Sequence, residues 1–313
     1  MRRLLNNSRF WLIVKVLLTL GFLFHFATKW EEFDIELIRS TWDKAKDHNL
    51  WIFGTLFFSM FIVNWLTDTQ LWWLAVRSQT HISFKEAFKI NLISHAVGLV
   101  TPANLGEYGI KALHFTELGK KKQSVLLTIS YRWAKWFVKS GFGLLAGYMI
   151  WKSTRPELAW ACLAILVVLA VVYAFLPRIL DALYHGKIGR FLFDDKEVTD
   201  WNFKNNYFWR AVSVACLKFS SYTLQLAILL HLGSELSLFD GFWRSSAIYS
   251  LSSFIPTLSL FDPMVKAGIG ELVIPQEMVS IAWIAVSTFL VWLTNLGLPS
   301  AVGYVLWWRM KSN

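Results

Sequence analysis

Cysteine is scarce in this chain, and its placement argues against two kinds of site. Among 313 residues there are two cysteines, Cys162 and Cys216, and both lie inside apolar runs. Two cysteines in that position support neither a disulfide framework nor a metal site, so we interpret both as packing residues. We expect no metal and no other cofactor.

Charged residues are also few, at 17% of the chain, although the formal net charge is +10. A nucleic-acid-binding protein would need a soluble basic face. No stretch provides one, because much of the surplus of Lys and Arg lies beside apolar runs. We therefore expect no nucleic acid among the partners.

Convincing catalytic motifs are missing. No Asp-x-Asp pair stands at the edge of an apolar run, and Asp194–Asp195 lies in a polar stretch without an accompanying cluster of ligands. His95 and His114 flank a proline-containing break, where single histidines are more often structural or hydrogen-bonded than catalytic. No residue is assigned a catalytic role.

What the chain has in abundance is apolar and aromatic residues. Hydrophobic residues make up 55% of it, with 18 Trp and 25 Phe, which is typical of membrane spans with aromatic belts at the interfaces. A helix needs about 20 apolar residues to cross a bilayer. Six runs approach or exceed that length: 10–27, 50–76, 124–151, 158–176, 207–232 and 281–308. The expected fold class is all-α, a polytopic integral membrane protein with about six full spans.

The first run could instead belong to a cleaved signal peptide, because Arg2, Arg3 and Arg9 precede it. No small-x-small cleavage site follows the run, and five further runs come later. These features favour a retained first helix.

The distribution of charge predicts an orientation, because Lys and Arg concentrate on the cytoplasmic side of membrane proteins. Basic residues are frequent in 77–122, in the expected loop 178–206 and at the C-terminal end, whereas the expected loop 28–49 leans acidic and 233–240 has no Lys or Arg. Both termini are therefore expected in the cytoplasm. Lys152 and Arg155, in a short outer loop, are exceptions.

The chain repeats itself once. The segment Ser83-Phe-Lys-Glu86-Ala-Phe88 matches Ser237-Leu-Phe-Asp240-Gly-Phe242 at an offset of 154 residues, and Gly147-Tyr148 matches Gly303-Tyr304 at 156. The offset changes by only two residues over this length, which predicts two repeats, 1–155 and 156–313, within one membrane domain. A rival alignment pairs Gly106-Glu107 with Gly270-Glu271, but it requires an insertion of ten residues.

Each half then consists of two spans, a broken hairpin and a third span. The hairpins are expected at 83–118 and 237–275, each broken at a proline. Three crossings per half would invert the second copy, an arrangement in which secondary transporters place their substrate site near the middle of the bilayer. We expect the two breaks to enter from opposite faces and to approach each other, either as re-entrant or as fully spanning segments.

The broken hairpins carry charged pairs at helical spacing. Glu107 and Lys111 are four residues apart, as are Asp262 and Lys266, so each pair shares a helix face. Each pair either neutralises itself and caps its hairpin, or forms part of a polar site or gate. The candidate binding or gating residues in the hairpins are Pro102, Asn104, Gly106, Glu107, Lys111, Pro256, Asp262, Lys266 and Glu271.

Further cations lie within the spans. Arg132, Lys135 and Lys139 form one stripe on 124–151, and Lys218 is near the middle of 207–232. A charge at that depth costs about 2.5–3.5 kcal/mol on insertion scales, so it usually faces the interior of the bundle. We expect Arg132, Lys135 and Lys218 to face a cavity in which cations outnumber acids. A phosphate would balance the excess, with Arg132 binding it in bidentate fashion.

One segment resembles a known family. Thr101-Pro-Ala-Asn-Leu-Gly-Glu-Tyr-Gly-Ile-Lys-Ala112 is similar to the Pro-x-x-x-Gly-Glu-x-x-(x)-Arg/Lys-Ala signature of the lysylphosphatidylglycerol synthase transmembrane-region family, and the likeness extends to the Arg132 span and to Phe254-Ile-Pro256. The resemblance implies a multi-pass, lipid-handling protein of the bacterial cytoplasmic (inner) membrane. It departs from the family at Pro263, where glycine is usual. No soluble aminoacyl-transfer domain is expected, so synthase activity is not implied.

Three functions are consistent with these features. The leading hypothesis is a lipid transporter or flippase for an anionic phospholipid or lipid phosphate, with membrane lipids as its partners. The first alternative is a membrane-embedded enzyme acting on a lipid phosphate, with Glu107 or Glu271 as the base. The second is a non-catalytic partner in envelope assembly, whose internal charges would tolerate substitution.

Overall fold

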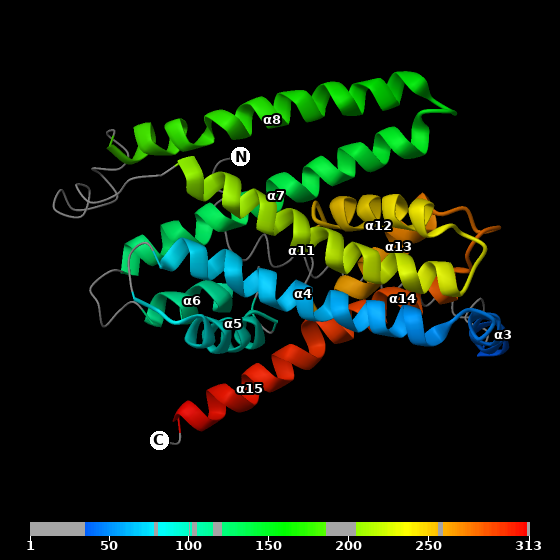
Figure 1. The fold of residues 1–313 in the computed structure, drawn as a ribbon, viewed down its shortest axis with the longest axis horizontal. Coiled ribbons are helices and arrows are strands. Elements are labelled where there is room, and N and C mark those ends of the chain that lie inside the picture. Colours follow the sequence, from blue (N-terminus) through cyan, green and yellow to red (C-terminus); the bar gives the residue numbers. More distant parts are fainter. Residues whose placement is uncertain are drawn as a thin grey trace, which may run out of the picture.

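The computed structural model describes residues 35–77, 81–99, 101, 105–114, 121–185, 205–255 and 259–311. The expected span 10–27 and the candidate residues Pro102, Asn104 and Pro256 lie outside these ranges. The described part of the chain is built of helices and contains no strand (Figure 1). The expected all-α class is therefore confirmed.

Long helices form most of the structure. They are α4 (Leu50–Val76), α7 (Lys121–Trp151), α8 (Pro156–His185) and α11 (Asn205–Leu232). The last long segment runs from α14 (Ile281–Trp292) through a π-helical segment, η4 (Leu293–Gly297), into α15 (Leu298–Lys311). The shorter helices are α3 (Ile35–Ala45), α5 (Phe84–Leu99), α6 (Leu105–His114), α12 (Leu238–Ser252), the 3-10 turn η3 (Ser259–Phe261) and α13 (Asp262–Val273).

Four helices of the described chain are long and apolar enough to cross a membrane: Leu50–Val76, Pro156–Leu176, Trp209–Leu232 and Ile281–Arg309. Helix α7 is of similar length, but its lysines and Arg132 lower its hydropathy. On α8, consecutive turns expose Ile165, Val168 and Val172 by more than half. Apolar surface of that extent suits contact with lipid, so the chain is a membrane protein.

Two predicted loops are partly helical. The acidic 28–49 stretch contains α3, which buries Thr41 and Ala45 on one face while Arg39 and Lys44 stay exposed. One buried face is enough to hold a charged stretch in a helix. The predicted 178–206 loop begins too early, because α8 continues to His185. A span helix can extend past its apolar run when its polar end leaves the hydrocarbon.

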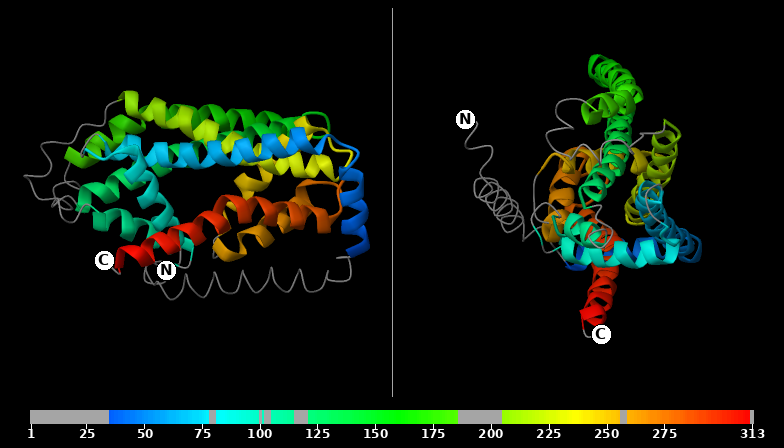
Figure 2. Two further views of the ribbon diagram at one scale, coloured as in Figure 1. Left: turned by 60° about the horizontal axis from the view of Figure 1, so that its bottom comes forward. Right: turned by 90° about the vertical axis from the view of Figure 1, so that its left-hand side faces the viewer.

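The two helical hairpins lie at opposite ends of the bundle. Helices α5 and α6 fold back on each other at the end where α4 finishes and α7 begins, and α12 and α13 do so at the other end (Figures 1 and 2). Helix α5 packs against α15, α12 packs against α7, and α4 packs against α11. Each hairpin thus packs against part of a long helical segment from the other half of the sequence.

Glycines allow the closest of these approaches. A Cβ atom on Gly303 of α15 would lie 2.1 Å from the Leu92 carbonyl oxygen of α5, and one on Gly143 of α7 would lie 2.4 Å from the Ser250 Cβ. Small residues at helix crossings let backbones meet in membrane proteins. The hairpins are therefore held tightly, which fixes the side chains between them.

Candidate functional site

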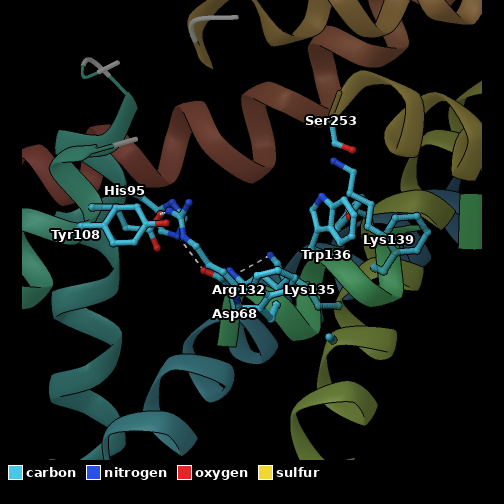
Figure 3. A pocket seen from close by; sticks show the side chains of 14 residues that line it. Asp68, His95, Tyr108, Arg132, Lys135, Trp136, Lys139 and Ser253 are labelled. Atoms are coloured by element: carbon cyan, nitrogen blue, oxygen red, sulfur yellow. Dashed lines mark hydrogen bonds and ion pairs between the residues drawn. The ribbon is translucent and has the colours of Figure 1, made fainter. Parts of the chain in front are cut away.

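A cavity of about 640 Å³ opens between the two hairpins and the long helices α4, α7 and α11. Its charged lining comprises Asp68, Glu107, Arg132, Lys135, Lys139 and Lys218, together with His95. Figure 3 shows the labelled side chains around one space, with His95, Tyr108 and Arg132 on one side and Lys139, Trp136 and Ser253 on the other. The cavity therefore joins charges from both halves of the chain.

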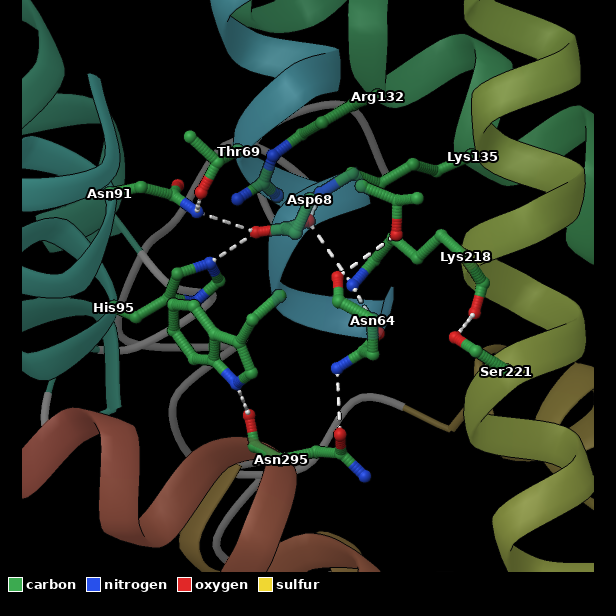
Figure 4. Close-up of polar contacts among 12 residues, drawn as sticks. Asn64, Asp68, Thr69, Asn91, His95, Arg132, Lys135, Lys218, Ser221 and Asn295 are labelled. Atoms are coloured by element: carbon green, nitrogen blue, oxygen red, sulfur yellow. Dashed lines mark hydrogen bonds and ion pairs between the residues drawn. The ribbon is translucent and has the colours of Figure 1, made fainter. Parts of the chain in front are cut away.

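Asp68 of α4 is the centre of the polar contacts (Figure 4). Its Oδ1 lies 2.6 Å from the Lys135 Nζ and 3.2 Å from the Lys218 Nζ. Its Oδ2 accepts a hydrogen bond of 2.9 Å from the Asn91 Nδ2 and lies 2.8 Å from the His95 Nε2. The side chain is almost completely buried. A buried carboxylate is stable only when charges and donors surround it in this way.

Glu107 of α6 is the second buried acid. Its Oε1 accepts a hydrogen bond of 2.7 Å from the Lys111 Nζ, and its Oε2 forms an ion pair with Arg132 of α7. The Arg132 guanidinium also lies over the Tyr108 ring, 4.2 Å from its centre, a favourable cation–π contact. The Glu107–Lys111 pair is therefore more than a self-neutralising pair, because it holds a cation of another helix.

The corresponding pair of the second half behaves differently. Lys266 and Asp262 form an ion pair within α13, and the Lys266 Nζ lies over the Tyr249 ring at 4.7 Å. Neither residue lines the cavity, although Tyr249 contacts Tyr222, which does. Glu271 is not among the residues that line the cavity, and it accepts a hydrogen bond of 3.1 Å from Gln276. The structure thus gathers Glu107, Lys111, Arg132, Lys135, Lys139 and Lys218, and leaves Glu271 outside.

Cations exceed acids around the cavity. Of the described residues, the lining together with Lys111, which pairs with Glu107, contributes two acids (Asp68, Glu107) and five cations (Lys111, Arg132, Lys135, Lys139, Lys218), a formal excess of three. Within the described chain, the Lys139 Nζ has no hydrogen-bond or ion-pair partner. An anion in the cavity would offset this excess.

A chain of amides links the charges to the π-helical segment. The Asn64 Oδ1 accepts from the Lys218 Nζ at 2.9 Å, and the Asn64 Nδ2 donates to the Asn295 Oδ1 of η4 at 2.7 Å. Asn295 donates in turn to the Gln225 Oε1 at 2.6 Å, and its carbonyl oxygen accepts from the Trp65 Nε1 at 3.1 Å. The π-helical turn therefore presents both a side chain and a carbonyl group to α4.

The sequence predictions missed Asp68, Asn64, Asn91 and Asn295. Asp68 could have been found, since it is the only charged residue in the 27 residues of α4, and an intramembrane charge is a functional-site hypothesis by default. The three asparagines carry no such signal. Their role depends on which helices meet.

The described residues contain no group of three or more His, Cys, Asp or Glu side chains that could hold a metal ion. A comparison with known families finds no family model that matches the chain, and a comparison with curated proteins finds no match either. The possible functions are therefore inferred from the cavity and its charges.

Proposed function

We propose that this protein is a flippase-like membrane transporter whose cavity holds the phosphate of an anionic phospholipid or another lipid phosphate. The observation that carries the proposal is the excess of cations around a cavity between membrane helices, with Lys139 lacking a partner among the described residues. Lysine and arginine are the side chains that bind phosphate best.

The cost of burying unbalanced charge favours an anionic cargo over a purely structural role for the cavity cations. Buried cations without enough acids are unfavourable in a low-dielectric interior. Asp68 and Glu107 compensate Lys135, Lys218, Lys111 and Arg132 in part. A phosphate that enters the cavity would supply the missing negative charge.

We further propose that the chain has six spans in two inverted repeats. The reciprocal packing of α5 on α15 and of α12 on α7 supports this, since each pair joins the hairpin of one half to the last span of the other. Helix α7 would be a span despite its charges, and 10–27 would be the sixth. Inverted repeats with broken helices bring substrate sites to the middle of the bilayer.

The proposed location is the bacterial inner membrane with both termini in the cytoplasm. The C-terminal ends of α4 and α15, where Arg77 and Arg309 stand in the sequence, lie at one end of the bundle, and the connection from α11 to α12, which has no Lys or Arg in 233–240, lies at the other (Figure 1). The likeness of 101–112 to the lysylphosphatidylglycerol synthase transmembrane-region family is consistent with this location and with a lipid cargo.

The test is lipid exchange in liposomes. Purified protein is reconstituted with a fluorescent anionic phospholipid, and the rate of exchange between leaflets is compared with that of a zwitterionic analogue. Glu107→Gln and Arg132→Ala should slow exchange of the anionic lipid at least tenfold, because each removes part of the ion pair at the cavity. Arg155→Ala is the matched control, since Arg155 is exposed outside the cavity.

Each other outcome identifies an alternative. Chemical conversion of the lipid would favour the membrane-embedded enzyme. Exchange that is absent, or equally fast in all variants, would exclude transport through this cavity and leave the role of an envelope-assembly partner.

A further inference from the structure

A second, apolar groove adjoins the cationic cavity. It has a volume of about 420 Å³ and lies between α7, α8, α12 and the end of α13. Its walls include Leu144, Ile150, Leu169 and Leu251, and the described residues that line it include no Asp, Glu, Lys or Arg. The groove therefore suits an apolar ligand, whereas the cavity suits an anion.

Trp136 connects the two spaces, because it lines both. Its ring contacts the Phe254 ring edge-on, with ring centroids 6.3 Å apart. Phe254 lines the groove, and its neighbour Ser253 lines the cavity. Figure 3 shows Trp136 beside Lys139, on the side of the cavity away from Arg132. The boundary between cationic and apolar surface therefore lies at this tryptophan, one helical turn from Lys139.

The groove is long enough for a lipid chain. Along α7 it reaches from Trp136 to Trp151, a rise of about 22 Å at 1.5 Å per residue. Half of the hydrocarbon core of a bilayer is about 15 Å thick. An acyl chain with its head near Trp136 can therefore lie in the groove along most of its length.

The groove is also open to the bilayer. Leu251 is 49% exposed and Phe254 is 64% exposed, although both line the groove. Ile165 of α8, on the facing wall, is 55% exposed. A lipid chain could therefore enter sideways between α8 and α12 and would not need to thread through the protein.

We infer that the groove holds an acyl chain of the lipid whose phosphate contacts Lys139, an inference that rests on the proposed function. One lipid molecule then occupies both spaces. Its phosphate lies in the cationic cavity, and its chain runs along α7 towards the α7–α8 connection. Trp136 and Phe254 contact the part of the lipid between the two. The cargo class is an acylated phosphate, and a free phosphate would fill only half of the site.

The test uses two photoactivatable phosphatidylglycerol analogues in reconstituted protein. One carries a diazirine next to the acyl carbonyl group and the other carries it at the end of the chain. The first should crosslink near Trp136 and Phe254, and the second near Ile150 and Trp151. Label spread over the exposed face of α8, at Val168 and Val172, would mean that the lipid lies in the bulk bilayer and would overturn the inference.

A groove-filling variant separates this inference from the proposed function. Leu144→Trp should reduce terminal-diazirine crosslinking and anionic lipid exchange at least fivefold, whereas Val168→Trp, on the lipid-facing surface of α8, should change neither. Competition by glycerol phosphate for the cavity should be the same in Leu144→Trp as in the parent protein.

The two possible failures give different results. Normal exchange and normal crosslinking in Leu144→Trp would overturn the groove and leave transport in place. If Lys139→Ala and Arg132→Ala do not change the rate of exchange, but the lipid still crosslinks in the groove, the proposed transport is overturned. The groove then remains a lipid-binding site.

Discussion

At the scale of single residues, Asp68 organises the site. Its carboxylate bridges α4 to α7 through Lys135 and to α11 through Lys218, and it contacts Asn91 and His95 of α5. Four long or hairpin helices thus meet at one carboxylate. Breaking one partner of a buried ion pair leaves uncompensated charge, so this position is more sensitive than any surface ion pair.

Asp68→Asn should therefore destabilise the protein by about 3–5 kcal/mol, because the Lys135 and Lys218 ammonium groups lose their shared acceptor. Thermal unfolding in detergent measures the effect. Adding Lys218→Met to Asp68→Asn should restore part of the stability, since one buried cation is removed with its partner. Asp43→Asn, in the exposed pair with Lys46, serves as the control. An Asp68→Asn protein as stable as the parent would contradict the role given to this residue.

A charge that stands in an apolar run is the clearest site signal that this sequence carries, although its role in binding stays a prediction. Lys135, Lys139 and Lys218 line the cavity, and each was a candidate because its depth in a span is costly. The same rule covers Asp68, which was overlooked. Asn91 and Asn295 could not be found, because amides are common in helices and their partners come from helices far away in the sequence.

At the scale of elements, the arrangement depends on close crossings between hairpins and long helices. Helix α5 meets α15 at Gly303, and α12 meets α7 at Gly143. The hydrophobic runs predicted the helices well, and the run 50–76 coincides with α4. The π-helical segment η4 had no signal in the sequence, since it is stabilised by contacts of Asn295 with other helices.

Gly303→Ala should destabilise the protein by about 1–3 kcal/mol, because the new methyl group would overlap a backbone carbonyl group that cannot move alone. Gly54→Ala is the matched control, since a Cβ atom there meets nothing within 4 Å, and it should be neutral or slightly stabilising. Both are measured by thermal unfolding in detergent. Equal midpoints for the two variants would contradict the tight α5–α15 contact.

At the scale of the whole molecule, the two ends of the bundle differ in composition. The C-terminal ends of α4 and α15, which include Arg77 and Arg309 in the sequence, meet at one end, and the opposite end carries the connection 233–240, which has no Lys or Arg. The connection between α7 and α8, which contains Lys152 and Arg155, lies at this second end and weakens the contrast. On the positive-inside rule we propose that the first end faces the cytoplasm.

Labelling of single cysteines tests this orientation. In a background with Cys162 and Cys216 replaced by Ala, a membrane-impermeant maleimide added to intact cells should label Lys152→Cys and Glu235→Cys. Arg77→Cys and Arg309→Cys should react only after the cells are opened. Labelling of Arg77→Cys and Glu235→Cys from the same side would contradict the proposed topology.

We propose that the cavity cations bind the phosphate of a lipid. Solid-state NMR can measure the proximity of lipid phosphorus to side-chain nitrogen directly, in protein labelled at Lys and Arg and reconstituted with an anionic phospholipid. We predict contacts from phosphorus to the Lys139 Nζ and to the Arg132 guanidinium, and their loss when Lys139→Ala or Arg132→Ala removes each assigned signal. Phosphorus contacts confined to basic side chains outside the cavity, such as Lys152 and Arg155, would contradict the account.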